Sequence, residues 1–146
     1  MSWTAQPRPV HWASLTAEEA AEEWDALHRW VERLRTRYPF GVRLPDCWWR
    51  HNDLVEVLAA LRDFERASFD RSAPATGPVE WQRALRDMEL RTESWIKRYP
   101  CSVPGREHDT LTDDQRPTPP GWGEFVGQDV ERRRRRAEFP TPGPSD

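Results

Sequence analysis

The chain has 146 residues, of which 36% are hydrophobic and 32% are charged, so it holds enough apolar material for one modest core. No apolar run is long enough to span a bilayer, and no signal-peptide pattern opens the chain, so we expect a cytoplasmic protein without membrane contact. The formal net charge of -3 argues against a protein that coats nucleic acid, and it limits any phosphate contact to a local patch.

The first predicted helix begins after Thr16, which is an N-cap residue, and Glu19 three positions later completes a capping box. Pro39 ends this helix, because the residue before a proline is driven out of the α region. Apolar residues recur at steps of four and three, the spacing of a helix that packs against other helices. They are Ala20, Trp24, Leu27, Val31, Leu34 and Tyr38.

Two further helices follow from the same pattern. The second begins at Asn52 or one turn earlier and ends near Phe69, and the third begins at Gly77 and Pro78 and ends at Pro100. The residues expected to face inward from the second helix are Leu54, Val57, Leu58, Leu61 and Phe64. Those expected from the third are Trp81, Leu85, Met88, Thr92, Trp95 and Tyr99.

The composition changes near residue 100. Residues 101–146 contain 7 of the 14 prolines and 5 of the 7 glycines, with few aliphatic side chains to bury, which predicts a disordered tail. We therefore predict an all-α fold: an antiparallel three-helix bundle over 16–101, an N-terminal arm over 1–15 and a flexible, disordered tail over 102–146.

Two cysteine–histidine pairs flank the predicted bundle. Cys47 and His51 precede the second helix, and Cys101 and His108 follow the third. In an up-down-up bundle the end of the first helix, the start of the second and the end of the third share one pole, so the pairs would meet and could complete a structural zinc site. The alternatives are a disulfide, which a reducing cytosol disfavours, and two ordinary buried thiols with no cofactor.

The chain contains nine tryptophans, and some of them are candidates for binding a protein partner. Tryptophan next to arginine is a composition enriched at protein interfaces. The alternative is that these rings seal one end of the bundle, since a small domain needs large side chains to close its core. In the tail, an apolar island around Trp122 either docks on a partner or folds back on the bundle. The partner-binding candidates are Trp30, Trp48, Trp49, Arg50, Trp122 and Phe125.

Two groups of arginines are candidates for contact with nucleic-acid phosphates or with an acidic partner. The first is a run of five in the tail, and the second is a stripe at intervals of four along the first helix, whose simpler interpretation is a solvated face. They are Arg132, Arg133, Arg134, Arg135 and Arg136 in the run and Arg29, Arg33 and Arg37 in the stripe. Neither a phosphate-binding glycine loop nor a hydrolase or metalloprotease motif occurs, which predicts a protein that is not an enzyme and has no small-molecule substrate.

The segments His11-Trp12, Leu15–Glu19 and Leu54–Leu61, and above all Cys47-Trp48-Trp49-Arg50-His51, resemble a family of small actinobacterial proteins of unknown function. The resemblance covers residues 11–101 and implies an origin near plasmid, conjugative or phage-like genes, but no activity. The sequence thus favours a non-enzymatic helical protein-interaction module in a mobile-element or phage-related assembly. The alternative is a nucleic-acid-associated accessory protein that uses Arg132–Arg136 and carries a structural zinc.

Overall fold

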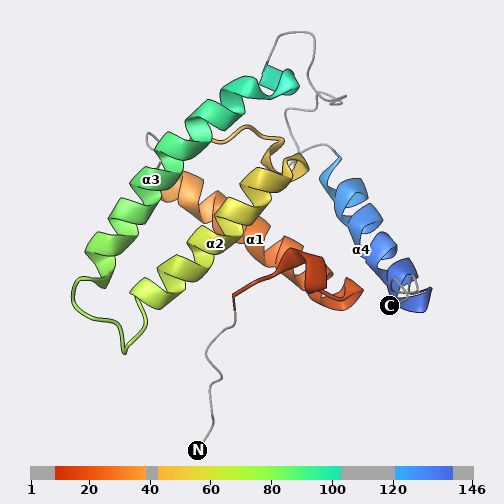
Figure 1. Ribbon diagram of the computed structural model, residues 1–146, viewed down its shortest axis with the longest axis horizontal. Helices are drawn as coiled ribbons and strands as arrows, with labels where there is room; N and C mark the ends of the chain where they lie inside the picture. Colours follow the sequence, from red (N-terminus) through yellow and green to blue (C-terminus); the bar gives the residue numbers. More distant parts are fainter. Residues whose placement is uncertain (1–8, 39–42, 103–120, 140–146) are drawn as a thin grey trace, which may run out of the picture.

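The computed structural model describes residues 9–38, 43–102 and 121–139. All regular structure in these ranges is helical, which confirms the predicted all-α class (Figure 1). The described ranges contain four α-helices, one more than the sequence predicted. They are α1 (Ala17–Arg37), α2 (Asn52–Ser68), α3 (Gly77–Arg98) and α4 (Trp122–Glu138). Short 3-10 turns precede α1 and α2 and follow α3: η1 (Trp12–Ser14), η2 (Trp48–Arg50) and η3 (Pro100–Ser102).

The helices begin where the sequence provides start signals. The Thr16 hydroxyl accepts a hydrogen bond from the Glu19 backbone N–H at 3.2 Å, which satisfies one of the free donors of the first turn of α1. A proline occupies the first turn of α3, where a missing N–H costs nothing. A Cβ at Gly77 would overlap the carbonyl oxygen of Ser68, so the close approach of α3 to the end of α2 requires glycine there.

Helices α2 and α3 lie side by side as a hairpin joined by residues 69–76, α1 crosses α2, and α4 packs along α1 (Figure 1). The end of α1 does not share a pole with the end of α3. The Tyr38 hydroxyl accepts hydrogen bonds from Trp81 Nε1 and Gln82 Nε2 at 3.3 Å, so the end of α1 lies at the start of α3. The prediction that the end of α1 lies at the same pole as the start of α2 and the end of α3 is therefore wrong, because α1 crosses the hairpin instead of running antiparallel to α2.

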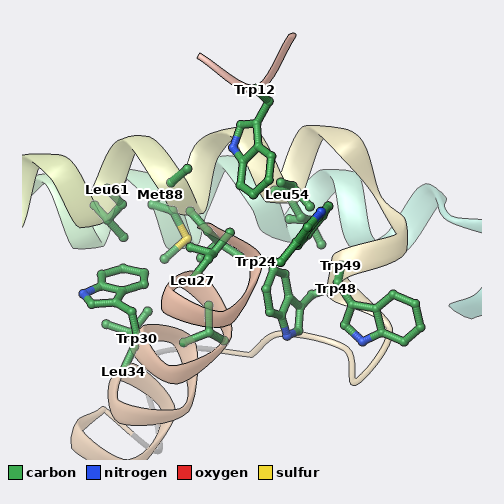
Figure 2. Packing of buried hydrophobic residues seen from close by; sticks show 14 of the residues in the cluster. Trp12, Trp24, Leu27, Trp30, Leu34, Trp48, Trp49, Leu54, Leu61 and Met88 are labelled. Carbon is green, nitrogen blue, oxygen red and sulfur yellow. The ribbon is translucent and has the colours of Figure 1, made fainter. Parts of the chain in front are cut away.

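The core lies between the hairpin and α1, and the stripes predicted for the first and third helices face it. Figure 2 shows the rings of Trp12, Trp24, Trp48 and Trp49 gathered in one part of the core and Trp30 in another. In α2 the predicted face is rotated: Phe64 is 40% exposed, whereas Val55 and Ala59 are buried. The expectation for Phe64 is wrong because the buried face of α2 is centred toward Val55 and Ala59, which turns position 64 toward solvent.

Helix α4 lies inside the segment predicted to be a disordered tail, and this prediction is wrong for residues 122–138. One face of α4 packs on α1: the Trp122 ring lies 4.8 Å from the His28 ring, and Phe125 meets Trp24 edge to face at 5.6 Å. Asp129 is buried and accepts a hydrogen bond from Trp24 Nε1 at 2.8 Å. A few large anchors at helical spacing thus hold a helix that composition alone would leave unfolded.

Among the described residues, none of the helices combines the length and the hydropathy that a membrane crossing requires.

Candidate metal centre

The loop before α2 is held in place by a side chain of α1. Arg35 Nη2 donates hydrogen bonds to the carbonyl oxygens of Leu44 and Pro45 at 2.9 and 3.0 Å, and Arg35 Nη1 lies 3.4 Å from an Asp46 carboxylate oxygen. Three contacts from one guanidinium fix three successive residues, because its five donors form a rigid fork. The next residue along the chain is Cys47, so α1 sets the position of the first candidate ligand.

The turn η2 then brings Cys47 and His51 to the same side. Trp48 and Trp49, at 0% and 1% exposure, anchor this turn in the core. The Arg50 and His51 backbone N–H groups donate to the carbonyl oxygens of Cys47 and Trp48 at 2.9 and 3.1 Å, which closes one tight turn between the two candidate ligands. The cysteine is the N-cap of η2 and the histidine is the N-cap of α2, so buried indoles hold both residues at helix ends.

The third candidate ligand comes from the other side of the hairpin. Cys101 lies in η3, directly after α3. The preceding Tyr99 stacks its ring on the His51 ring, with centroids 3.9 Å apart and planes 5° from parallel. The Tyr99 hydroxyl also donates to Asp53 Oδ1 at 2.6 Å. Tyr99 therefore ties the end of α3 to the start of α2 and orients the imidazole.

The three ligand atoms form a triangle with the edges of a tetrahedral zinc site. Cys47 Sγ lies 3.8 Å from Cys101 Sγ, and His51 Nε2 lies 3.5 and 3.4 Å from the two sulfurs. Zn–S bonds of about 2.3 Å and Zn–N bonds of about 2.0–2.1 Å at tetrahedral angles place two sulfurs about 3.8 Å apart and a sulfur and a nitrogen about 3.5 Å apart. The observed triangle matches three corners of that tetrahedron, and among the described residues no other group of histidine, cysteine or acidic side chains is as close.

The environment of Cys47 favours the protonated thiol in the absence of a metal. Burial, a hydrogen bond with Cys101 and the nearby Cys101 charge raise the pKa of Cys47 to about 11, so its thiol is neutral at pH 7. A divalent cation reverses this balance, because a coordinating thiol loses its proton. The sulfur separation of 3.8 Å is far above the ~2.05 Å of a disulfide, and both cysteines are free. The three ligand residues are half-buried. The fourth predicted ligand, His108, lies outside the described residues.

The predicted partner-binding residues are mostly inside the protein. Trp30, Trp48 and Trp49 are buried, a packing that favours the alternative in which the rings close the core. Trp122 and Phe125 are half-buried against α1 and η2, so the apolar island folds back on this chain.

Arg50 stacks over the Trp49 ring, with its guanidinium carbon 4.7 Å from the ring centroid. Its Nε is buried.

The predicted phosphate-binding arginines do not form one surface. Arg133 is 13% exposed, pairs with Asp129 at 2.8 Å and donates to the Leu15 carbonyl oxygen at 3.0 Å, so it belongs to the α1–α4 contact. Arg33 belongs to the other group of arginines and lies 18 residues beyond Leu15, about 27 Å further along the axis of α1, so the two groups are far apart. The others are exposed, and Arg29, Arg132, Arg134 and Arg135 make ion pairs with nearby acids on their own helices. Arg37 lies near the end of α1 and Arg136 near the end of α4.

Two interactions that position the ligands of this site were not predicted from the sequence. The clamp from Arg35 to the loop carries no local signal, since arginine at the end of a helix is ordinarily explained by the helix dipole. The stacking of Tyr99 on His51 could have been suspected, because an aromatic residue two positions before Cys101 must approach the same pole as the cysteine.

Comparisons of this chain with family models, with curated proteins and with solved structures give no match.

Proposed function

We propose that this protein is a zinc-binding helical module that acts by binding another protein, with Zn²⁺ as a structural ion on Cys47, His51 and Cys101. The observation that carries the proposal is the triangle of two sulfurs and one imidazole nitrogen, with edges of 3.8, 3.5 and 3.4 Å. Any one of these edges could be an ordinary contact between two side chains, but three metal-ligating atoms that converge on one point suit a bound ion.

The position of the triangle supports a structural role for the ion. The α2–α3 hairpin is closed at one end by residues 69–76, whereas its other end has no covalent connection. The three ligands lie at that open end: Cys47 and His51 at the start of α2, and Cys101 after α3. An ion on these atoms would join the two helices there, which is how a small domain with a limited core gains stability.

The binding role rests on the distribution of side chains. The described residues include large apolar side chains left exposed outside the metal centre, among them Phe69 and Leu90 at 58% and 56% exposure. Phe69 also lines a cavity together with Trp30 and Trp81, and a contiguous apolar surface of this kind suits contact with another protein. The resemblance to proteins encoded near plasmid, conjugative or phage-like genes would place this contact in a mobile-element or phage-related assembly.

Metal analysis of the full chain, purified without a histidine tag under reducing conditions, tests the proposal. We expect about one zinc per chain, and absorption bands of tetrahedral thiolate-bound cobalt after exchange for Co²⁺. The variants Cys47→Ser, Cys101→Ser and His51→Asn should lose the metal. The matched control is His11→Asn, because His11 lies beside η1 and contacts Ser14 instead of the sulfurs.

The variant His108→Asn reports separately on the fourth ligand predicted from the sequence. A lower affinity would assign that role to His108, and an unchanged affinity would leave the fourth position to solvent or another group. A folded wild-type chain that binds neither zinc nor cobalt would refute the structural ion.

A further inference from the structure

A second site lies at the closed end of the hairpin, away from the metal centre. A cavity of about 720 Å³ opens between the last turns of α1, the end of α2 and the start of α3. Its volume falls within the range of cavities that hold small ligands or single side-chain anchors, about 300–1,000 Å³. Its apolar lining includes Trp30 and Trp81, at 4% and 1% exposure, and Phe69, which lies at the end of α2 and is largely exposed.

The charged side chains that line this cavity differ in their partners within the chain. Of its two acids, Glu65 accepts a hydrogen bond from Trp30 Nε1 at 3.2 Å, and Glu32 lies 3.8 Å from Arg35. Arg33 and Arg37 also line the cavity and are exposed, and neither makes a hydrogen bond or an ion pair with any described residue. The acids are thus engaged while two guanidinium groups, one helical turn apart, remain available for an anion.

Arg29, the third member of the stripe on α1, differs from these two. It pairs with Asp25 at 3.0 Å and does not line the cavity. The three arginines of this stripe therefore differ in their surroundings: Arg29 pairs with an acid on its own helix, whereas Arg33 and Arg37 line the cavity. This difference indicates that the cavity and its two arginines form one binding surface.

We propose that this cavity is the docking site for an acidic segment of a partner protein. An aromatic or aliphatic side chain of that segment would fill the space lined by Trp30, Trp81 and Phe69, and flanking carboxylates would pair with Arg33 and Arg37. Aromatic pockets next to arginine are where protein interfaces concentrate their binding energy, and arginine binds carboxylates in a bidentate manner. The inference rests on the proposed binding role, because it names the surface and the chemistry of the partner.

The same observations disfavour a nucleic acid. Bases stack on exposed aromatic faces, and of the tryptophan and phenylalanine rings that line the cavity Phe69 alone is largely exposed. A phosphate backbone would also need a continuous basic track, whereas this cavity offers two arginines one helical turn apart. A side-chain anchor with adjacent carboxylates satisfies the apolar lining and the arginines together.

The experiment is the selection of peptides from a random phage-displayed library on the zinc-loaded full chain, followed by anisotropy titration of the selected peptides. We expect sequences in which acidic residues flank an aromatic or aliphatic residue. Replacing both exposed arginines by the double substitution Arg33→Glu, Arg37→Glu should weaken binding by about tenfold or more, because two attractions become repulsions. The matched control Arg29→Glu should change binding by less than about twofold.

The indole N–H resonances of Trp30 and Trp81 provide a second readout, since both rings line the cavity and should shift on binding. A library that yields no binder, peptides without acidic residues, or equal losses in the double variant and in Arg29→Glu would overturn the proposal. So would a single-stranded oligonucleotide whose binding depends on Arg33 and Arg37.

Measuring the zinc content of the variants distinguishes failure of this docking proposal from failure of the proposed structural ion. The double variant and Arg29→Glu should both retain the metal, because the cavity lies at the closed end of the hairpin and the three metal ligands lie at its open end. A chain that binds no zinc but selects acidic peptides at this cavity would refute the ion and leave the docking site intact.

Discussion

Removing the proposed zinc should lower the stability of the protein by an amount that follows from its position in the chain. Cys47 and Cys101 are 54 positions apart. Releasing a cross-link that closes a loop of this length returns about 4 kcal/mol of chain entropy to the unfolded state at 25 °C. The unfolding entropy of a chain of 146 residues is about 0.3 kcal/mol per K, so the midpoint of thermal unfolding should fall by about 10–15 °C.

Thermal unfolding followed by circular dichroism measures this shift directly. Wild-type protein is compared with and without a zinc chelator, and Cys47→Ser is treated in the same way. A reductant that does not bind zinc is required throughout, because sulfurs 3.8 Å apart could otherwise form a disulfide and cross-link the same two residues. The control His11→Asn should show the wild-type response.

The reasoning fails if the chelator leaves the midpoint of the wild type unchanged, or if Cys47→Ser loses stability equally with and without zinc. The first result would show that no ion joins the two helices. The second would assign the loss to the packing of the thiol.

Three further outcomes follow from individual contacts. Asp129→Ala should cost about 3 kcal/mol in urea unfolding, because it leaves the buried Trp24 indole without its acceptor and removes the carboxylate that pairs with Arg133. The exposed ion-pair control Glu131→Ala should cost under about 0.5 kcal/mol. Gly77→Ala should cost about 1–3 kcal/mol by the same measurement, since its Cβ would overlap the Ser68 carbonyl oxygen, and an unchanged stability would show that α3 can move aside. From Cys47 alone, zinc affinity should fall about tenfold for each pH unit below about pH 11, because its pKa is raised to about 11 and metal binding must release the thiol proton. Competition with a chelator between pH 9 and pH 11 checks this, since a thiol with the ordinary pKa of 9.0 would give a flat profile in that range.

Local signals in the sequence located the first three helices. The Thr16 cap, the proline in the first turn of α3 and the alternation of four- and three-residue steps each act within a few residues, so they are readable without the fold. The meeting of Cys47 with Cys101 was also predictable, because it requires only that α2 and α3 run antiparallel with a short link. The hairpin satisfies that condition whatever the direction of α1.

The predictions that were wrong concern features that depend on contacts between distant parts of the chain. Composition predicts disorder for 122–138 because this segment is rich in arginine and poor in aliphatic residues, yet Asp129 and Arg133 find partners near the start of the chain. The crossing of α1 over the hairpin likewise depends on Trp81 and Tyr38, which are 43 positions apart. Contacts of this kind leave no periodic trace in the sequence, so only the structure reveals them.

The bond between Trp24 and Asp129 spans 105 positions, which has a consequence for synthesis on the ribosome. At a synthesis rate of about 5–20 residues per second, α4 follows roughly 5–20 s after α1, and the aromatic face of α1 stays uncovered until then. During that interval several indoles are open to solvent and to other nascent chains. Slowed translation of the codons that separate α1 from α4 should therefore promote aggregation, even though the amino-acid sequence is unaltered.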